Sequence, residues 1–111
     1  MVKFLTVTTT AGRKELCPIH NYASIIGHSN TVVKIAISPG SNSTTLDIME
    51  ITLSAADPLW VAKTSIQEGS MVDILQKLVI EASSRGSYTD PYFDITNRIP
   101  IPIDSIIPKA T

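Results

Sequence analysis

The sequence predicts a mainly β domain of the α+β class: an antiparallel meander, or a sandwich-like or barrel-like domain, with one amphipathic helix and an extended C-terminal arm. In several short segments, β-branched and aromatic residues alternate with polar ones, which is typical of strands. Only residues 70–85 carry apolar residues at helical spacing. With 111 residues the chain has the size of one domain. We therefore expect one β-rich domain over residues 1–96 and an arm over residues 97–111.

The first strands follow from their turn signals. Residues 2–10 are β-branched and aromatic, and a turn at residues 11–13 leads into a return strand over residues 14–19, which predicts a hairpin. Pro18 marks the return strand as an edge strand or a bulged one. A short apolar stretch follows at residues 22–26, and the polar turn formers of residues 27–30 predict a break.

The clearest strand is residues 31–38, in which Val33, Ile35 and Ile37 share one face. A loop rich in turn formers separates it from residues 44–54, so the two segments are expected to pair as a second hairpin. The alternation slips near Ile48 and Met49, which indicates a bulge or a strand covered on both faces. Residues 59–62 fit a short strand and a turn of helix equally well.

Residues 70–85 form the predicted helix. Ser70 is placed to cap its N-terminus, with Asp73 at the third helical position and Lys77 one turn further on for an ion pair. Arg85 and Gly86 supply a C-terminal end signal. The apolar stripe, which we expect to cover the sheet, consists of Met71, Ile74, Leu75, Leu78, Val79 and Ala82.

Residues 92–96 are expected to be the last strand, with the arm after them. In extended geometry Ile99, Ile101 and Ile103 lie on one face. The nitrogens of Pro100 and Pro102 lie along one edge and cannot donate, so the arm can pair with a sheet on one side only. It could dock within its own chain or on a neighbour.

Composition narrows the classes of partner. The net charge is -1 and the basic residues are scattered, which argues against nucleic acid. The prolines interrupt the isoleucine-rich tail, so no stretch reaches the length of a membrane span. Charged residues make up only 17% of the chain, below the roughly 25% of typical soluble domains. A surface with so little charge is typical of a protein that binds partners.

No constellation of residues predicts catalysis, a cofactor or a metal. Cys17 and His20 are close in sequence and His28 follows, but a structural zinc site needs four ligands. The carboxylates, among them Asp57 and Asp94, are dispersed and are interpreted as solvated. For Asp94 and the residues that follow it, the sequence favours a plain turn, and a polar knot at the base of the arm is the alternative. An enzyme or metal protein centred on Cys17, His20 and His28 is therefore the third hypothesis, below an assembly protein and a small regulatory or ligand-binding module.

The candidate interface residues are apolar side chains in the arm and aromatic side chains near the predicted loops, because aromatic residues are enriched at interface hot spots. The alternative is that the aromatic side chains cap the core. The candidates are Ile99, Ile101, Ile103, Ile106, Ile107, Trp60, Tyr92 and Phe93.

The order of segments resembles a class of small virion-associated proteins of marine tailed phages. The resemblance rests on residues 4–9, 31–35 and 46–53 and on the helix after Ser70. It implies a non-enzymatic virion component, such as a capsid decoration or cement protein, assembled in the host cytoplasm as a homo-oligomer or with other virion proteins. The resemblance assigns no site residues to this chain. The alternative is a small cytosolic regulatory or ligand-binding β module.

Overall fold

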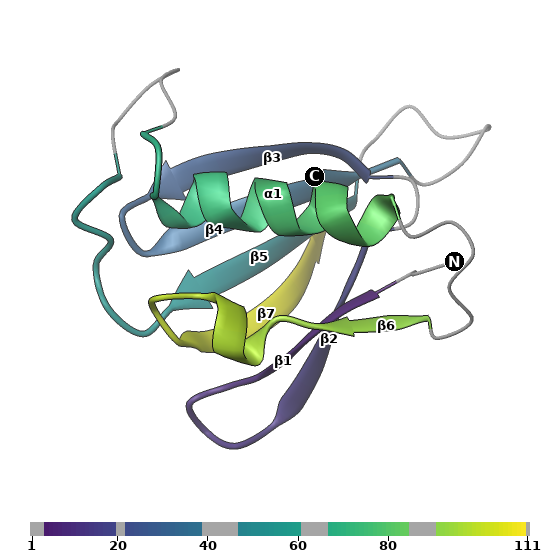
Figure 1. Ribbon diagram of the computed structural model, residues 1–111, viewed down its shortest axis with the longest axis horizontal. Coiled ribbons are helices and arrows are strands. Elements are labelled where there is room, and N and C mark those ends of the chain that lie inside the picture. The colour runs from purple at the N-terminus through teal and green to yellow at the C-terminus, as the bar shows by residue number, and fades with distance from the viewer. Residues whose placement is uncertain (1–3, 20–21, 39–46, 61–66, 85–90, 111) are drawn as a thin grey trace.

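A computed structural model describes residues 4–19, 22–38, 47–60, 67–84 and 91–110. Within them the chain is mostly strand with one α-helix, as the sequence predicts (Figure 1). The elements in chain order are β1 (Phe4–Thr8), β2 (Lys14–Pro18), β3 (Tyr22–Ser29), β4 (Val32–Ile37), β5 (Asp47–Leu53), α1 (Met71–Ser83), β6 (Tyr92–Asp94), a 3-10 turn η1 (Thr96–Arg98) and β7 (Ile103–Ala110).

The smaller sheet has three strands in the order β2-β1-β6. Strands β1 and β2 form the predicted opening hairpin, and Pro18 lies at the end of an edge strand, as expected. Strand β6 pairs with β1 in parallel, so one pair departs from the antiparallel pattern. The crossover that makes this possible includes α1, because parallel neighbours need a long connection.

The larger sheet has four strands in the order β3-β4-β5-β7. The break expected at residues 27–30 is wrong in its position, because β3 continues to Ser29 and turns only at Asn30 and Thr31. Gly27 is needed inside the strand for space: a Cβ built on it would lie 2.7 Å from Val72 Cγ2 and 3.0 Å from the indole nitrogen of Trp60. Glycine permits this close approach of the helix and the indole to the strand backbone.

Strands β4 and β5 form the second predicted hairpin, with Val33, Ile35 and Ile37 on the core face. Of the two alternatives for Ile48 and Met49, the bulge is absent from the described pairing, because the register between β4 and β5 runs without a shift. The register shift lies instead on the β7 side, between Thr52 and Leu53. On the second alternative, a strand covered on both faces, Met49, Ile51 and Leu53 are buried on the core face, whereas the residues of the other face are at most half-buried.

The predicted arm is built into the fold, and residues 92–96 are not the last strand. Residues 103–110 form β7, which pairs with β5 at the edge of the larger sheet. Ile103 is completely buried, so a domain confined to residues 1–96 would lack part of its own core. Pro100 and Pro102, which were expected to lie along the edge of the arm, precede the strand. The proline within the edge strand is Pro108.

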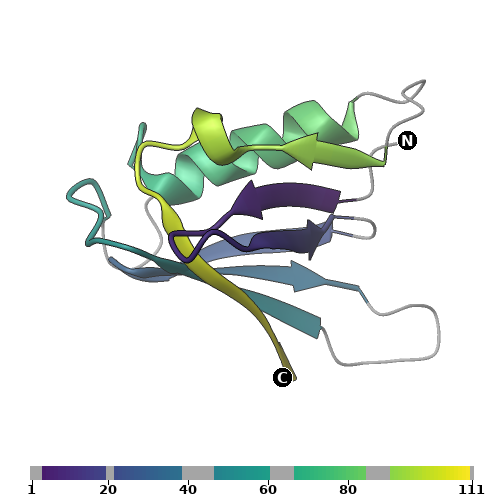
Figure 2. The ribbon, with the colours of Figure 1, turned by 90° about the horizontal axis from the view of Figure 1, so that it is seen from below.

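The two sheets meet at β2 and β7. The amide of Thr10 donates to the carbonyl of Ile103 at 3.0 Å, and the amide of Ile106 donates to the Glu15 carboxylate at 2.6 Å. These two hydrogen bonds join the sheets, which stay separate in their strand pairing. Helix α1 lies beside β3 and near β6 (Figures 1 and 2).

Helix α1 matches its prediction closely. Ser70 is the N-cap and accepts from the amide of Asp73, and Asp73 pairs with Lys77 at 3.0 Å. Five of the six stripe residues are buried, and Ile74 packs against the core. Arg98 of η1 makes a two-pronged ion pair with Glu81, with contacts of 2.7 and 2.8 Å, which ties the segment after β6 to the helix. Arg85 and Gly86 lie outside the described residues.

Within the described ranges, no helix is both long enough and apolar enough to cross a membrane.

Candidate functional site

Most of the predicted interface residues are buried in the core or pack against it. Ile103 and Phe93 are buried in the core. Trp60 is half-buried and its indole N–H donates to the carbonyl of Gly27 at 3.4 Å. Three further isoleucines of the arm, which are partly buried and pack against the core, are Ile99, Ile101 and Ile106.

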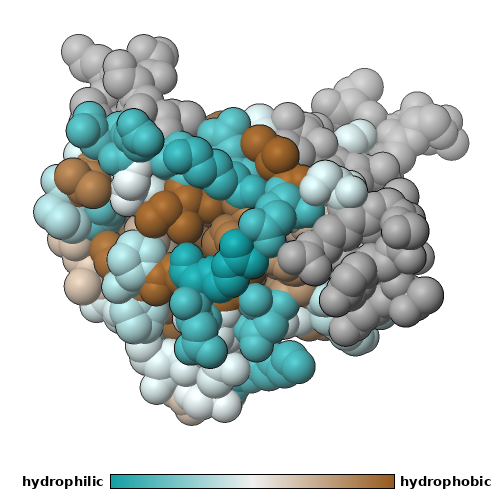
Figure 3. All heavy atoms as spheres, in the orientation of Figure 1, coloured by the Kyte–Doolittle hydropathy of each residue, from teal (hydrophilic) through white to brown (hydrophobic). Residues whose placement is uncertain are grey.

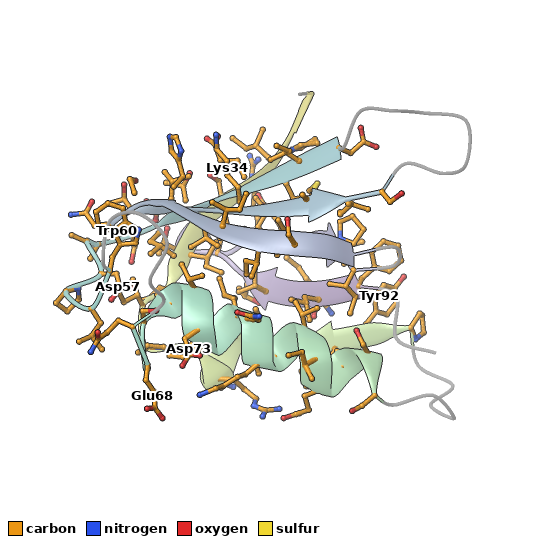
Figure 4. The ribbon with its side chains drawn as sticks, turned by 90° about the horizontal axis from the view of Figure 1, so that it is seen from above. Lys34, Asp57, Trp60, Glu68, Asp73 and Tyr92 are labelled. Carbon is orange, nitrogen blue, oxygen red and sulfur yellow. The ribbon has the colours of Figure 1, made fainter. Side chains whose placement is uncertain are left out.

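Two predicted interface residues are exposed, and they lie on different sheets. Tyr92 on β6 is 47% exposed, and Ile107 on β7 is 46% exposed. In Figure 4 Tyr92 lies at the end of the molecule opposite Asp57 and Trp60. The structure therefore divides the predicted interface between two separate surfaces.

The surface around Tyr92 is a hollow on the outer face of the smaller sheet. Its volume is about 350 Å³, and Lys14, Leu16 and Tyr92 line it. The register explains this grouping, because Phe4 is paired with Tyr92, Thr6 with Leu16 and Thr8 with Lys14. Alternate residues of β1 share a face, so all of these side chains lie opposite the core residues Leu5 and Val7.

Apolar and aromatic groups form one part of this hollow. Leu16 is 42% exposed although it is a large aliphatic residue. The rings of Phe4 and Tyr92 are in contact, with their centroids 5.9 Å apart and their planes tilted by 32°. Aromatic and aliphatic side chains around a concavity are the usual lining of a binding site.

Thr6 lies at the centre of the same face, between Leu16 on β2 and Asp94 on β6. It is almost completely buried, and its hydroxyl has no hydrogen-bond partner. Among the described residues this is the one buried side-chain oxygen or nitrogen in that state. An unsatisfied buried hydroxyl costs about 1–3 kcal/mol.

Charges of both signs border the hollow. The hydroxyl and the amide of Thr96 both donate to the Asp94 carboxylate, at 2.7 and 3.0 Å. These bonds lower the pKa of Asp94, and the positive charge of Lys14 lowers it further. The same Thr96 hydroxyl accepts from the amide of Thr8. Residues 96–98 thus form the turn that the sequence favoured, and the bonds between Asp94 and Thr96 add the polar contacts of the alternative. Together with the bond from Thr8 they fix β6 and η1 against β1.

Asp57 is not solvated, contrary to the sequence-based interpretation. It is buried, and its carboxylate accepts from the amides of Leu59, at 3.0 Å, and Met71, at 2.8 Å. Its own amide donates to the carbonyl of Asn30 at 2.7 Å. Figure 4 shows it near the start of α1. Its position is structural: it connects the turn after β3, the segment after β5 and the first turn of the helix.

Cys17 lies in the core on the opposite side of β2 from the hollow. Burial raises the pKa of its thiol to about 12, so at neutral pH it is not the thiolate that nucleophilic chemistry requires. His28 is exposed on β3, and His20 lies outside the described residues. Among the described residues, no three His, Cys, Asp or Glu side chains are grouped for a metal ion.

The face that carries α1 has a different character. In Figure 3 hydrophilic side chains cross this face, and hydrophobic ones are visible between them. Ile80 on α1 is 57% exposed, but it stands on a helix face whose neighbours include the exposed Lys77.

No protein-family model matches the chain, and neither the curated proteins nor the solved structures contain a match.

Sequence reasoning missed the hollow. Alternation places Leu16 and Lys14 together on one face of β2, but this face is outward only because Cys17 is buried, which the structure shows. An outward leucine in an edge strand is a signal of a binding surface. The contribution of Tyr92 could not be read in this way, because the parallel pairing of β6 with β1 is not encoded locally.

Proposed function

We propose that the protein is a non-enzymatic structural or assembly protein, and specifically a virion component such as a capsid decoration protein. We propose that it binds its partner through the hollow on the outer face of β2-β1-β6. The observation that supports the proposal is the hollow itself, in which Leu16 and Tyr92 are exposed on the outer face of the three-stranded sheet.

The contacts around the hollow support binding by a preformed surface. Phe4 stacks on Tyr92, and the bonds between Asp94 and Thr96 fix the strand that carries Tyr92. A fixed surface loses little conformational entropy when a partner docks. An apolar side chain of the partner would fill the hollow, and a carboxylate beside it would meet Lys14.

The test is co-sedimentation of the tagged full chain with particles purified from the source of this sequence. We expect saturable binding, at least tenfold weaker for Leu16→Lys because an ammonium group would have to be desolvated in the hollow. Ile80→Lys is the matched control: it makes the same change at another exposed aliphatic residue, and binding should be retained. Recovery of the wild-type chain only in the supernatant would contradict the proposal.

A second candidate, a small ligand-binding or regulatory module of the cytosol, is favoured by the size of the hollow. About 350 Å³ lies within the range of small-molecule sites. Lys14 beside Leu16 and Tyr92 suits a ligand with a carboxylate attached to an apolar body. Titration with aromatic and aliphatic carboxylates, followed by NMR at the Leu16 methyl groups, tests this candidate. Saturable shifts at millimolar ligand would favour it over the assembly protein.

A further inference from the structure

The outer face of the larger sheet carries a row of four residues whose order is self-complementary. The register pairs Ile26 on β3 with Lys34 on β4, Lys34 with Glu50 on β5, and Glu50 with Ile107 on β7. Cross-strand partners share a face, so the row reads isoleucine, lysine, glutamate, isoleucine from one edge of the sheet to the other.

This row lies on the side of the sheet away from the core. Val33 and Ile35, which flank Lys34 in β4, are buried in the core, so Lys34 points to the other face. Figure 4 shows Lys34 on the side of the sheet opposite α1. Ile26 is 52% exposed and Ile107 is 46% exposed, so large aliphatic side chains are open to solvent at both margins.

We propose that this face binds a second copy of the chain, about a two-fold axis that lies between the two sheets and runs parallel to β4 and β5. Such an axis exchanges the two halves of the row. Ile26 then meets Ile107 of the second copy, and Lys34 meets Glu50 of the second copy, each contact occurring twice. An isologous interface requires self-complementarity of this kind.

A neighbouring row agrees with the same axis. Val32 and Thr52 are paired in the register and half-buried, and the rotation places each of them against the other in the second copy. Two β-branched side chains opposite each other can interdigitate between aligned sheets. Ala36, which is paired with Ile48, is only 3% exposed and offers the second copy no surface.

The charges select this axis over the alternative one. An in-plane axis perpendicular to the strands would place Lys34 over Lys34 and Glu50 over Glu50 of the second copy, and like charges in contact disfavour that arrangement. In the proposed arrangement the four charges alternate in sign, whatever pairing Lys34 and Glu50 also make within one sheet. The isoleucines supply most of the attraction, and the charges fix the orientation.

Sheet twist does not disrupt the match. Aligned sheets pack about 10 Å apart at roughly 30°. The outer strands lie about 7 Å from the axis, so that angle displaces Ile26 from Ile107 of the second copy by about 4 Å. This is less than the roughly 7 Å between successive residues on one face of a strand.

The size of the face indicates a weak interaction. Four strands about 4.8 Å apart and about six residues long cover roughly 400 Å² per copy, or about 800 Å² in total. This is below the roughly 1,200 Å² at which standard stable interfaces begin. Area alone does not fix affinity, so we take the dissociation constant of a weak, transient dimer, roughly 10–100 μM, as the expectation to test.

The test is sedimentation equilibrium of the full chain from 1 to about 500 μM, a range chosen to span this expected dissociation constant. The apparent mass should rise from 12.0 kDa toward twice that value. Lys34→Glu alone and Glu50→Lys alone each create rows of one charge and should weaken association at least about tenfold. Mixing these two variants should restore a heterodimer, and the double variant should restore the homodimer.

Arg13→Glu is the matched control, since it makes the same charge change in the exposed turn between β1 and β2, and should associate as the wild type does. Thermal unfolding at low concentration confirms that each variant is folded. A wild type that remains monomeric at about 500 μM, well above the expected dissociation constant, overturns the proposal. A dimer that the Lys34 and Glu50 variants leave unchanged also overturns it.

The proposal is independent of the hollow on the smaller sheet. Leu16→Lys should leave self-association unchanged, and Lys34→Glu should leave the hollow intact, so failure of either proposal can be recognised separately. If both hold, one copy presents two binding surfaces, as a component of an assembly requires.

Discussion

Asp57 is a single side chain that joins three segments distant in the sequence. Its carboxylate accepts from Leu59 and from Met71, the first residue of α1, and its amide donates to Asn30. A carboxylate at a helix N-terminus is stabilised both by the free amides there and by the helix dipole. Because Asp57 is buried, water cannot replace these bonds when the carboxylate is removed.

We therefore expect Asp57→Ala to lower the free energy of unfolding by about 2–4 kcal/mol, because it leaves two amides without their charged acceptor. Asp57→Asn retains one acceptor oxygen and should lose less. Asp47→Ala, at an exposed carboxylate, should change stability by less than about 0.5 kcal/mol. Urea unfolding followed by circular dichroism measures all three. Equal stability of Asp57→Ala and Asp47→Ala would show that Asp57 contributes no net stability.

Gly27 is a second residue whose identity is explained by tertiary contacts. Its sequence neighbours suggest a turn, but it lies within β3, where Val72 and Trp60 approach the backbone too closely for a Cβ. The same contact explains why Trp60 is half-buried rather than an exposed anchor, since its indole lies against the strand and donates to Gly27.

At the scale of elements, the start of α1 combines a cap and a charge. Ser70 accepts from the amide of Asp73, and the Asp73 carboxylate accepts from the amide of Gly69 at 2.9 Å. That bond and the ion pair with Lys77 lower the pKa of Asp73. The bonds from Thr96 lower the pKa of Asp94 in the same direction.

The depressed pKa values predict sensitivity to acid. A carboxylate whose pKa is lower in the folded chain than in the unfolded one stabilises the fold above its ordinary value of 3.8, and this stabilisation is lost as the pH falls through the lower, folded pKa. We expect the free energy of unfolding to decrease from about pH 5 downward. Asp73→Asn combined with Asp94→Asn should flatten this decrease. Urea titrations between pH 6 and pH 2.5 measure the slope, and a wild type with no decrease would contradict the assignment.

Strand β7 is an edge strand whose outer side is partly blocked. The Ile106 amide points away from β5 and donates to Glu15, so alternation places the nitrogen of Pro108 on the same outer side, where it has no hydrogen to donate. Blocked edges of this kind limit pairing with further strands. Association through the face of the larger sheet remains open.

At the scale of the whole molecule, the C-terminal segment belongs to the fold. A chain truncated after Thr96 would lose the pairing with β5 and the buried Ile103, and we expect it not to fold. As point tests, Ile103→Ala should lower the free energy of unfolding by about 2–5 kcal/mol, while Ile107→Ala should lower it by less than about 1 kcal/mol. Urea unfolding at low micromolar concentration measures them. A truncated chain that folds with native near-UV circular dichroism would show that the arm is an appendage.

The local pattern of the sequence determined several elements of this protein. The alternation around Val33 and the stripe around Leu75 specify one strand and one helix, because a period of two or of 3.6 is a property of neighbouring residues. The cap at Ser70 and the first hairpin were readable for the same reason.

Only the tertiary structure decided which elements meet. The parallel pairing of Tyr92 with Phe4, the insertion of β7 beside β5 and the burial of Asp57 all join segments far apart in the chain. No local period records such partners, because they are selected by how the whole set of apolar faces can be buried at once. The hollow and the row of Ile26, Lys34, Glu50 and Ile107 are complete only after that selection, since the hollow needs β6 beside β1 and the row needs β7 beside β5.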